Sequence, residues 1–158
     1  MTNNQTASER LTGLGITLPP APKPVASYIP AVRSGNLLFV SGQIPLADGK
    51  LLMTGALPSA GSVEQAAQAA RQCAINALAV AQAELGSIDR ILRVVRVGCF
   101  VASEPGFADQ PKVANGASDL MVAVFGQDGR HARAAVGCPS LPLNATVEVE
   151  FVFEVGEG

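Results

Sequence analysis

The stretch TVEVEFVFEV at residues 146–155 alternates between two kinds of side chain with a period of two. Apolar side chains occupy one set of positions, namely Val147, Val149, Phe151, Phe153 and Val155, and glutamates occupy three of the others, namely Glu148, Glu150 and Glu154. Because successive side chains of a β-strand point to opposite faces of its sheet, this pattern predicts a strand with one face in the core. The glutamate face is most simply solvated, although on a central strand it would have to meet helices or another subunit.

Further strands are expected on the N-terminal side of this stretch. HARAAVG at residues 131–137 is a short apolar strand, and residues 91–101 are β-branched and apolar enough to form a buried one. Residues 27–33 and 37–40 flank a Ser-Gly-Asn turn, so they predict a hairpin. Its second strand should end at SGQIP, because Pro45 has no N–H to donate to a neighbouring strand.

Two helices are expected between these strands. Residues 62–86 begin with a capping box of Ser62 and Gln65, end at a glycine, and carry an alanine-rich apolar stripe that suits close packing on a sheet. Residues 111–126 run from a first-turn proline to a glycine and carry a second apolar stripe. The order of elements therefore predicts an α+β domain with two helices on one face of one sheet.

At 158 residues the chain has the length of one ordinary domain. Its N-terminal part is polar and ends with four prolines within residues 19–24. Prolines at this density forbid a regular helix there and favour an extended arm on the surface. We therefore expect a polar, proline-rich N-terminal arm over residues 1–24 and a single domain over residues 25–158.

The composition indicates an oligomer that binds neither nucleic acid nor membranes. Apolar residues make up 48% of the chain against 15% charged, and the mean hydropathy is +0.30, so part of the apolar surface should lie in subunit contacts. A net charge of -2 provides no basic stripe for a phosphate backbone. No apolar run reaches the roughly 18 to 20 residues of a membrane span, and no signal-peptide pattern is present. Three cysteines without a CxxC spacing indicate a reducing compartment, so a cytoplasmic protein is expected.

His131 is the only histidine of the chain. This excludes a two-histidine acid–base pair, a histidine zinc site and a conventional two-histidine ribonuclease mechanism within one chain. A serine nucleophile with His131 as its base lacks a GxSxG elbow, because the nearest string, NGASD at residues 115–119, lies inside a predicted helix. Phosphate-binding glycine motifs are also missing, and no metal or cofactor is expected. We interpret His131 as a partly exposed histidine beside a strand.

Arg133 lies in the apolar segment HARAAVG, between alanines that cannot shield its guanidinium or compete for it. A buried or half-buried guanidinium needs an anion. One interpretation is a structural salt bridge to an acid of the last strand. The other is that the small neighbours leave space over Arg133 for a ligand carboxylate, bound through two parallel hydrogen bonds. Composition does not choose between the two.

Three strings of the sequence are similar to those of one protein family. They are SGQIP at residues 41–45, GFADQPKVANGASDL at residues 106–120 and HARAAVGCPSLPLNATVEVE at residues 131–150. In their order and spacing they resemble the Rid family of reactive intermediate deaminases, also called YjgF-like and long labelled L-PSP endoribonucleases. The resemblance runs from about residue 24 to residue 155. The N-terminal arm and an extended segment around residues 51–61 are similar to the longer variety of this family.

The resemblance implies a chorismate-mutase-like α+β fold, a mixed β-sheet with two helices packed on one face, and a homotrimer with sites in the clefts between subunits. It also implies an enamine/imine deaminase, a hydrolase of the 2-iminobutanoate/2-iminopropanoate deaminase type, which converts reactive intermediates such as 2-aminoacrylate to a 2-keto acid and ammonia without a cofactor. Matched position by position, the carboxylate-binding arginine falls on Arg133, and the acid that orients the attacking water falls on Glu148. The substrate-binding positions fall on Tyr28, Ser41, Asn115 and the backbone carbonyl of Ala135.

The chain departs from the family pattern at two of these places. Many members carry a cysteine where Ala135 stands and a proline where Ser27 stands, so the preferred imine stays open. Two other functions also remain open. One is a non-catalytic trimer that binds small carboxylates in the same pocket. The other is an endoribonuclease or translation inhibitor. Three features of the sequence argue against it: a net charge of -2, a single histidine, and only one tyrosine and six phenylalanines for stacking on bases.

Overall fold

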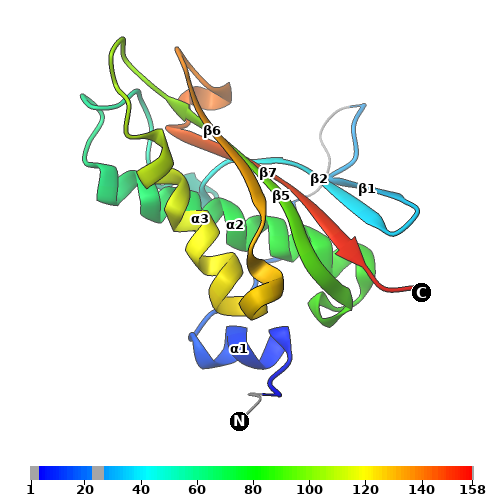
Figure 1. Cartoon of the computed structure of the whole chain (residues 1–158). Coiled ribbons are helices and arrows are strands. Elements are labelled where there is room, and N and C mark those ends of the chain that lie inside the picture. The colour runs from blue at the N-terminus through cyan, green and yellow to red at the C-terminus, as the bar shows by residue number, and fades with distance from the viewer. Residues whose placement is uncertain (1–3, 23–26, 158) are drawn as a thin grey trace.

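The computed structural model describes residues 4–22 and 27–157 and contains a five-stranded mixed sheet (Figure 1). Its strands are β1 (Ala31–Ser34), β2 (Leu37–Gln43), β5 (Ile91–Ala102), β6 (Ala132–Cys138) and β7 (Val147–Val155). Their order across the sheet is β1-β2-β7-β5-β6, with β5 and β6 parallel and the other pairs antiparallel. Two short strands, β3 (Leu46–Ala47) and β4 (Lys50–Leu51), pair separately. The predicted strands are confirmed, although the hairpin begins four residues later than expected, at Ala31 instead of residue 27.

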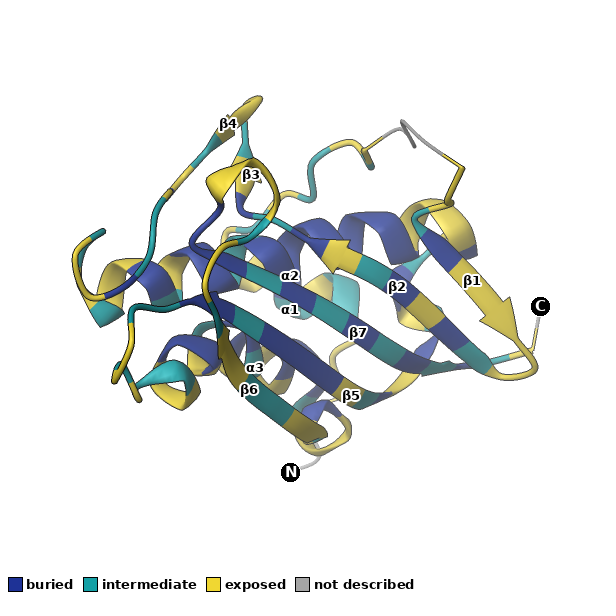
Figure 2. Ribbon diagram, turned by 90° about the horizontal axis from the view of Figure 1, so that it is seen from above, coloured by how far each residue is buried: buried dark blue, intermediate teal, exposed yellow. Residues whose placement is uncertain are grey.

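Helices α2 (Val63–Leu85) and α3 (Gln110–Phe125) lie together on one face of the sheet, as predicted (Figure 2). The Ser62 hydroxyl accepts from the backbone N–H of Gln65, and the Gln65 side chain accepts from the Ser62 N–H, which completes the predicted capping box. Gly86 ends α2 in the left-handed region, with φ at 83°. Local signals in the sequence therefore set both ends of α2.

The two helices approach each other closely because small residues lie where they meet. A Cβ atom added at Gly116 of α3 would run into the backbone carbonyl of Ala67 on α2. The buried face of α2 is rich in alanine and includes Ala66, Ala69, Ala70, Ala74, Ala77 and Ala81. This alanine-rich contact, expected from the sequence, lets α2 lie close to both α3 and the sheet.

Strand β7 is the central strand, and its two faces differ as its alternating sequence predicts. Five of its apolar side chains, at alternate positions from Val147 to Val155, are buried on the helix-covered face, where the rings of Phe151 and Phe153 stack with centroids 5.7 Å apart. The sixth, Val152, is half-buried on the other face. Its three glutamates are half-buried on the other face. None of the described helices covers that face, which we call the uncovered face (Figure 2).

The N-terminal arm contains a helix that the sequence analysis did not predict, α1 (Ala7–Gly13). The proline-rich run starts at Pro19, so it does not prevent a helix before that point. Leu11 is buried at 4% exposure, and α1 lies against the C-terminal end of α3 (Figure 1). The backbone N–H and the hydroxyl of Ser8 donate to the Asp89 carboxylate at 2.8 and 2.7 Å. This part of the arm is therefore packed on the domain.

We expect Leu11→Ala to lower the free energy of unfolding by about 2 to 3 kcal/mol, at the low end for a buried leucine because α1 lies at the edge of the core. Leu14 is the matched control, since it is 45% exposed next to the same helix. Leu14→Ala should cost less than about 0.5 kcal/mol. Urea unfolding of both variants measures the difference, and equal midpoints for Leu11→Ala and wild type would contradict the docking of α1.

Candidate functional site

Arg133 lies on β6, at the edge of the sheet, with its side chain on the helix-covered face. Its Nη1 donates to Asn115 Oδ1 at 2.8 Å and to Ser118 Oγ at 3.2 Å, and both partners belong to α3. Two predicted site residues, Arg133 and Asn115, are thus in direct contact. The expectation of a buried or half-buried guanidinium is wrong for the single chain. Arg133 is exposed because an edge strand has a neighbouring strand on one side only.

The salt bridge considered for Arg133 does not form among residues 4–22 and 27–157, because neither ion pair found there includes this residue. Its hydrogen-bond partners are neutral, so its charge is not compensated by a carboxylate of the described chain. Beneath it, burial raises the pKa of the Cys99 thiol to about 12, while the nearby Arg133 charge acts in the opposite direction. A guanidinium in this position is suited to an anionic ligand.

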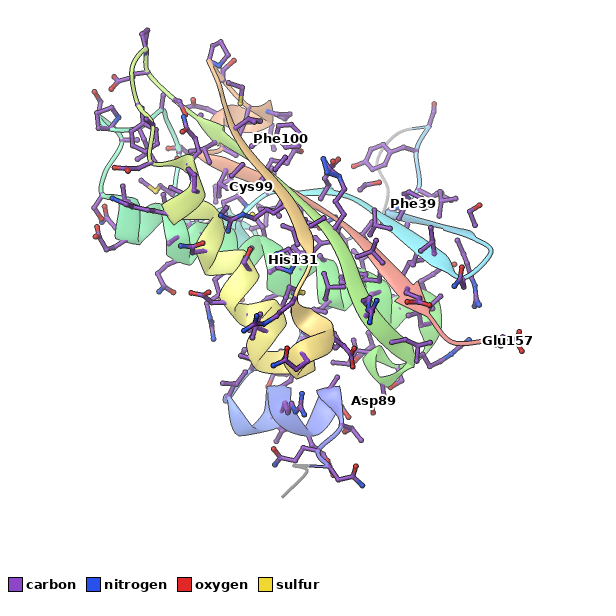
Figure 3. The ribbon with its side chains drawn as sticks, in the orientation of Figure 1. Phe39, Asp89, Cys99, Phe100, His131 and Glu157 are labelled. Carbon is purple, nitrogen blue, oxygen red and sulfur yellow. The ribbon has the colours of Figure 1, made fainter. Side chains whose placement is uncertain are left out.

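Ser118 also contacts His131, a pairing that the sequence analysis set aside. Ser118 Oγ and His131 Nε2 are 2.9 Å apart, and His131 Nδ1 lies 2.6 Å from the Gly129 carbonyl oxygen. A carbonyl oxygen only accepts hydrogen bonds, so Nδ1 carries the proton and Nε2 accepts from the Ser118 hydroxyl. His131 is partly exposed beside β6, as predicted (Figure 3). The sequence analysis set Ser118 aside because the string NGASD lies inside a predicted helix and not in a nucleophile elbow.

A groove of about 660 Å³ lies between α3 and the start of β6. Ser118, His131 and Arg133 line it together with Asp119 and Arg130. The groove is open to solvent within one chain, because β6 has no further strand beside it. A small carboxylic acid can therefore reach the Arg133 guanidinium and the Ser118 hydroxyl from the same side.

Glu148 lies on the opposite face of the sheet from Arg133. The register pairs Val149 with Cys99 and Cys99 with Ala135, so these side chains share the helix-covered face. Arg133 shares it too, since it lies two residues from Ala135 on the same strand. Glu148 precedes Val149 by one residue and therefore points to the uncovered face. Within one chain, the sheet itself separates the two predicted catalytic side chains.

Two glycines make room for the carboxylates on the uncovered face. A Cβ atom added at Gly42 would lie 2.9 Å from the carboxyl group of Glu148, and one added at Gly98 would lie 2.8 Å from a carboxyl oxygen of Glu150. Partial burial raises the pKa of Glu148 above its ordinary value, and the neighbouring Glu150 charge raises it further. A carboxylate with a raised pKa is a better proton acceptor near neutral pH.

The SGQIP segment borders Glu148 on this face. The Ser41 hydroxyl donates to the Ile29 carbonyl at 3.1 Å, which ties the segment to the residue after Tyr28. Tyr28 itself is 54% exposed. The buried Asn76 of α2 donates to the backbone carbonyl of Ile44 within the segment, at 3.1 Å, and to that of Leu46 just after it, at 3.0 Å. The sequence analysis did not single out Asn76, since its partners lie far away along the chain.

The predicted site residues therefore form two groups on opposite faces of the sheet. We call Arg133, Asn115 and Ala135 the arginine half-site, and Tyr28, Ser41 and Glu148 the glutamate half-site. The first group carries a positive charge and an open groove, and the second carries a carboxylate. One chain cannot bring both groups to a single small ligand.

Apolar side chains surround the glutamate half-site. Phe39 and Val136 are 46% and 47% exposed, and Phe39 and Phe100 both lie on the uncovered face (Figure 3). Phe39 pairs with Val152, and Phe100 pairs with Val136, so apolar side chains extend across several strands. An apolar surface of this kind is typical of a protein–protein interface.

Comparison with known proteins places the chain among proteins of this fold. A family model described as "YjgF/chorismate mutase-like, putative endoribonuclease" matches residues 8–155. The chain belongs to the YjgF-like, or Rid, family. The crystal structure of a protein of unknown function from Agrobacterium tumefaciens is similar to this Rid chain with a TM-score of 0.87 and 46% identity, over 95% of this chain and 92% of the other. The predicted family and the predicted α+β fold are confirmed.

Curated relatives of this Rid chain extend over nearly its whole length. Protein TCP17 of Trypanosoma cruzi is 48% identical over 146 residues, which cover 92% of this chain and 91% of the relative. A protein of Dermatophagoides farinae named 2-iminobutanoate/2-iminopropanoate deaminase is 34% identical over 137 residues, which cover 87% and 92%. In the part of this chain that the structure describes, no helix has the length and apolarity to cross a membrane. Nor do three His, Cys, Asp or Glu side chains gather there in a group that could hold a metal ion.

Proposed function

We propose that this Rid protein hydrolyses enamines and imines of small amino acids, such as 2-aminoacrylate, to 2-keto acids and ammonia. The observation that carries the proposal is the Arg133 guanidinium, which has neutral partners and lies at an open groove. A planar guanidinium binds a carboxylate through two parallel hydrogen bonds, and these substrates carry a carboxylate beside the reacting carbon. The name of the Dermatophagoides farinae relative supports the same activity.

The working form that we propose is a homotrimer whose clefts join the arginine half-site of one copy to the glutamate half-site of the next. Two observations support it: the half-sites lie on opposite faces of one sheet, and the uncovered face carries exposed apolar side chains such as Phe39 and Val136 beside its glutamates. In a trimer with threefold symmetry, the contact between an arginine half-site and a glutamate half-site occurs three times, and the three contacts close the ring. Light scattering should give the mass of three chains, and a monomer would contradict the proposal.

In this cleft Arg133 would hold the substrate carboxylate and draw electron density from the adjacent imine carbon. Glu148 of the next copy would accept a proton from a water molecule as the oxygen of that water bonds to the imine carbon. The resulting carbinolamine loses ammonia and leaves the 2-keto acid. Imines also hydrolyse slowly in water, so positioning and one acid–base group, worth about 10² to 10⁴-fold, are sufficient without a cofactor.

The test is ammonia release from 2-aminoacrylate generated in the assay by a dehydratase. A deaminase raises the rate of ammonia release in proportion to its own concentration. A non-catalytic carboxylate-binding trimer would bind pyruvate and leave that rate unchanged. Cleavage of RNA without ammonia release would favour the endoribonuclease instead.

A mixture of two inactive variants tests the shared cleft. Arg133→Ala lacks the arginine half-site and Glu148→Gln lacks the carboxylate, but a cleft built from one copy of each can be intact. If the trimers are dissociated and reassembled from an equal mixture, about one quarter of the clefts keep both groups, so about one quarter of wild-type activity should return. The same variants mixed without dissociation are the control. Full loss after reassembly would mean that Arg133 and Glu148 do not serve one cleft.

A further inference from the structure

A β-bulge interrupts β2 within the SGQIP segment, opposite β7. The register pairs Val40 of β2 with Phe151 of β7. Three residues further along β2, Gln43 pairs with Val149, which lies only two residues from Phe151 on β7. Strand β2 therefore carries one residue more than its partner over this span. Bulges of this kind bend a strand and re-aim the residues within it, and they are frequent next to active sites.

Within the bulge, the backbone of Gly42 lies against the carboxyl group of Glu148. A Cβ atom added at Gly42 would lie 2.9 Å from both Cδ and Oε1 of Glu148, so the carboxyl group occupies the space that a side chain would fill. Backbone this close keeps water from one side of the carboxyl group, and partial burial is the main cause of the raised pKa of Glu148. The position of the SGQIP segment thus affects how far water reaches Glu148.

Hydrogen bonds hold the first three residues of the segment in place. The backbone N–H of Ser41 donates to the Pro30 carbonyl at 2.8 Å, and its hydroxyl donates to the Ile29 carbonyl at 3.1 Å. The side chain of Gln43, which is 8% exposed, donates to the Ser41 carbonyl at 2.9 Å and closes the bulge. The other end of the segment is held from a different element, helix α2.

Asn76 of α2 anchors that other end. Its two side-chain N–H groups donate to the carbonyls of Ile44 and Leu46, and its amide oxygen accepts from Gln72 Nε2 at 3.0 Å. Because Gln72 lies one turn before Asn76 and donates to the amide oxygen, it fixes which way the Asn76 amide faces. Asn76 is also the one polar residue among the buried residues that the structure describes in α2. A buried amide that makes these hydrogen bonds is costly to replace.

We propose that Asn76 is a positioning residue for the deaminase reaction, which anchors the SGQIP segment and so holds the Gly42 backbone against Glu148. The inference rests on the deaminase function proposed above. Asn76 acts through the segment, because its side chain bonds to the segment and to Gln72 and not to Glu148 itself. Site residues keep their productive geometry only when supporting residues hold them.

The ionisable groups around Glu148 do not belong to the SGQIP segment, which contains no ionisable side chain. Glu150 acts on Glu148 as a like charge along β7. Cys138 of β6 and Cys73 of α2 also lie within reach, since the Glu148 charge contributes to the raised pKa of both thiols. In the proposed cleft, Arg133 of the neighbouring copy adds a positive charge. Moving the segment therefore changes the hydration of the Glu148 carboxyl group and leaves these charges in place.

NMR measures this hydration without turnover. A titration followed by ¹³C NMR of the carboxyl carbons, with Glu148→Gln to assign the resonance, gives the pKa of Glu148 in the assembled protein. In Asn76→Ala the segment loses two hydrogen bonds and water reaches the carboxyl group, so this pKa should fall by about half a pH unit or more. The control is Leu11→Ala, which destabilises the fold far from Glu148 and should leave the pKa unchanged. An unchanged pKa in a folded Asn76→Ala variant would overturn the proposal.

Kinetics test the consequence for the reaction. Asn76→Ala should lower kcat for 2-aminoacrylate about tenfold and leave KM within about threefold, because Arg133 still binds the substrate carboxylate. The fall of kcat at acidic pH should move to lower pH together with the pKa of Glu148. Leu11→Ala should change neither quantity. A folded Asn76→Ala variant with wild-type kcat and the wild-type acid limb would contradict the positioning role.

Gln72→Ala provides the same test with less risk to folding, because Gln72 is only partly buried. It removes the hydrogen bond that orients the Asn76 amide, so the pKa of Glu148 and kcat should fall in the same direction by a smaller amount, with kcat lowered about threefold. If Asn76→Ala does not fold, wild-type values in Gln72→Ala would overturn the proposal. A wild-type protein that releases no ammonia would instead refute the deaminase function and the role of Asn76 in it, whatever the titration shows.

Discussion

Arg133→Ala is expected to lower kcat/KM for 2-aminoacrylate by about 100-fold or more, equivalent to about 2.7 kcal/mol of transition-state binding. The substitution removes two charge-assisted hydrogen bonds to the substrate carboxylate, each worth about 1.5 to 3 kcal/mol. The variant should still fold, because Arg133 is exposed and its partners Asn115 and Ser118 are neutral and lie at the surface of α3. Steady-state kinetics measure the loss of kcat/KM. The melting temperature and the oligomer mass are the controls, because they show whether the variant still folds and assembles.

Arg133→Lys tests the shape of the cation separately from its charge. An ammonium group is a point charge and cannot reproduce the planar pair of parallel hydrogen bonds, so most of the activity should also be lost. If either variant keeps more than about a tenth of wild-type kcat/KM, a loss of about 1.4 kcal/mol or less, Arg133 does not bind the substrate carboxylate as proposed.

Glu148→Gln is expected to lower the turnover of 2-aminoacrylate by about 100-fold, at the low end for an acid–base group, while pyruvate binding is preserved. The amide keeps the shape of the carboxyl group but cannot accept a proton from water. Glu150→Gln is the matched control, because it removes the same charge from the same face of β7. It should change the turnover by less than about twofold at pH 8. Equal losses in both variants would indicate a general electrostatic effect, and no loss in either would make Glu148 a structural acid.

The pH dependence of kcat provides a second test of the role of Glu148 as proton acceptor. Glu148 must be ionised to accept a proton, so kcat should fall as the pH drops through its pKa. Burial and the Glu150 charge raise that pKa, so this fall should lie at higher pH than for an ordinary glutamate. Glu150→Gln removes the like charge and should therefore move the fall to lower pH. An acid limb that does not move in Glu150→Gln would mean that another group controls it.

The chain's own local signals determine most of its secondary structure. The alternation in β7, the Ser62–Gln65 capping box and Gly86 act through contacts between near neighbours, and the structure confirms each of them. The helix α1 was missed although a local signal, the capping box of Thr6 and Glu9, marks its start. Its burial depends on packing against α3, which lies far away in the sequence. Family membership was also readable from the sequence, since the arginine-to-VEVE string carries it.

Only the tertiary structure decides how the candidate site residues are grouped. In the sequence Arg133 and Glu148 stand fifteen positions apart and look like members of one pocket. The pairing of β5 with both β6 and β7 sets the two side chains on opposite faces of the sheet, because strand residues alternate and the register fixes which ones align. The same packing brings Ser118 to His131 across the groove, although nothing in their spacing indicates it. Local patterns depend on neighbours along the chain, whereas these juxtapositions depend on strand register and helix docking, which form only when distant segments pack together.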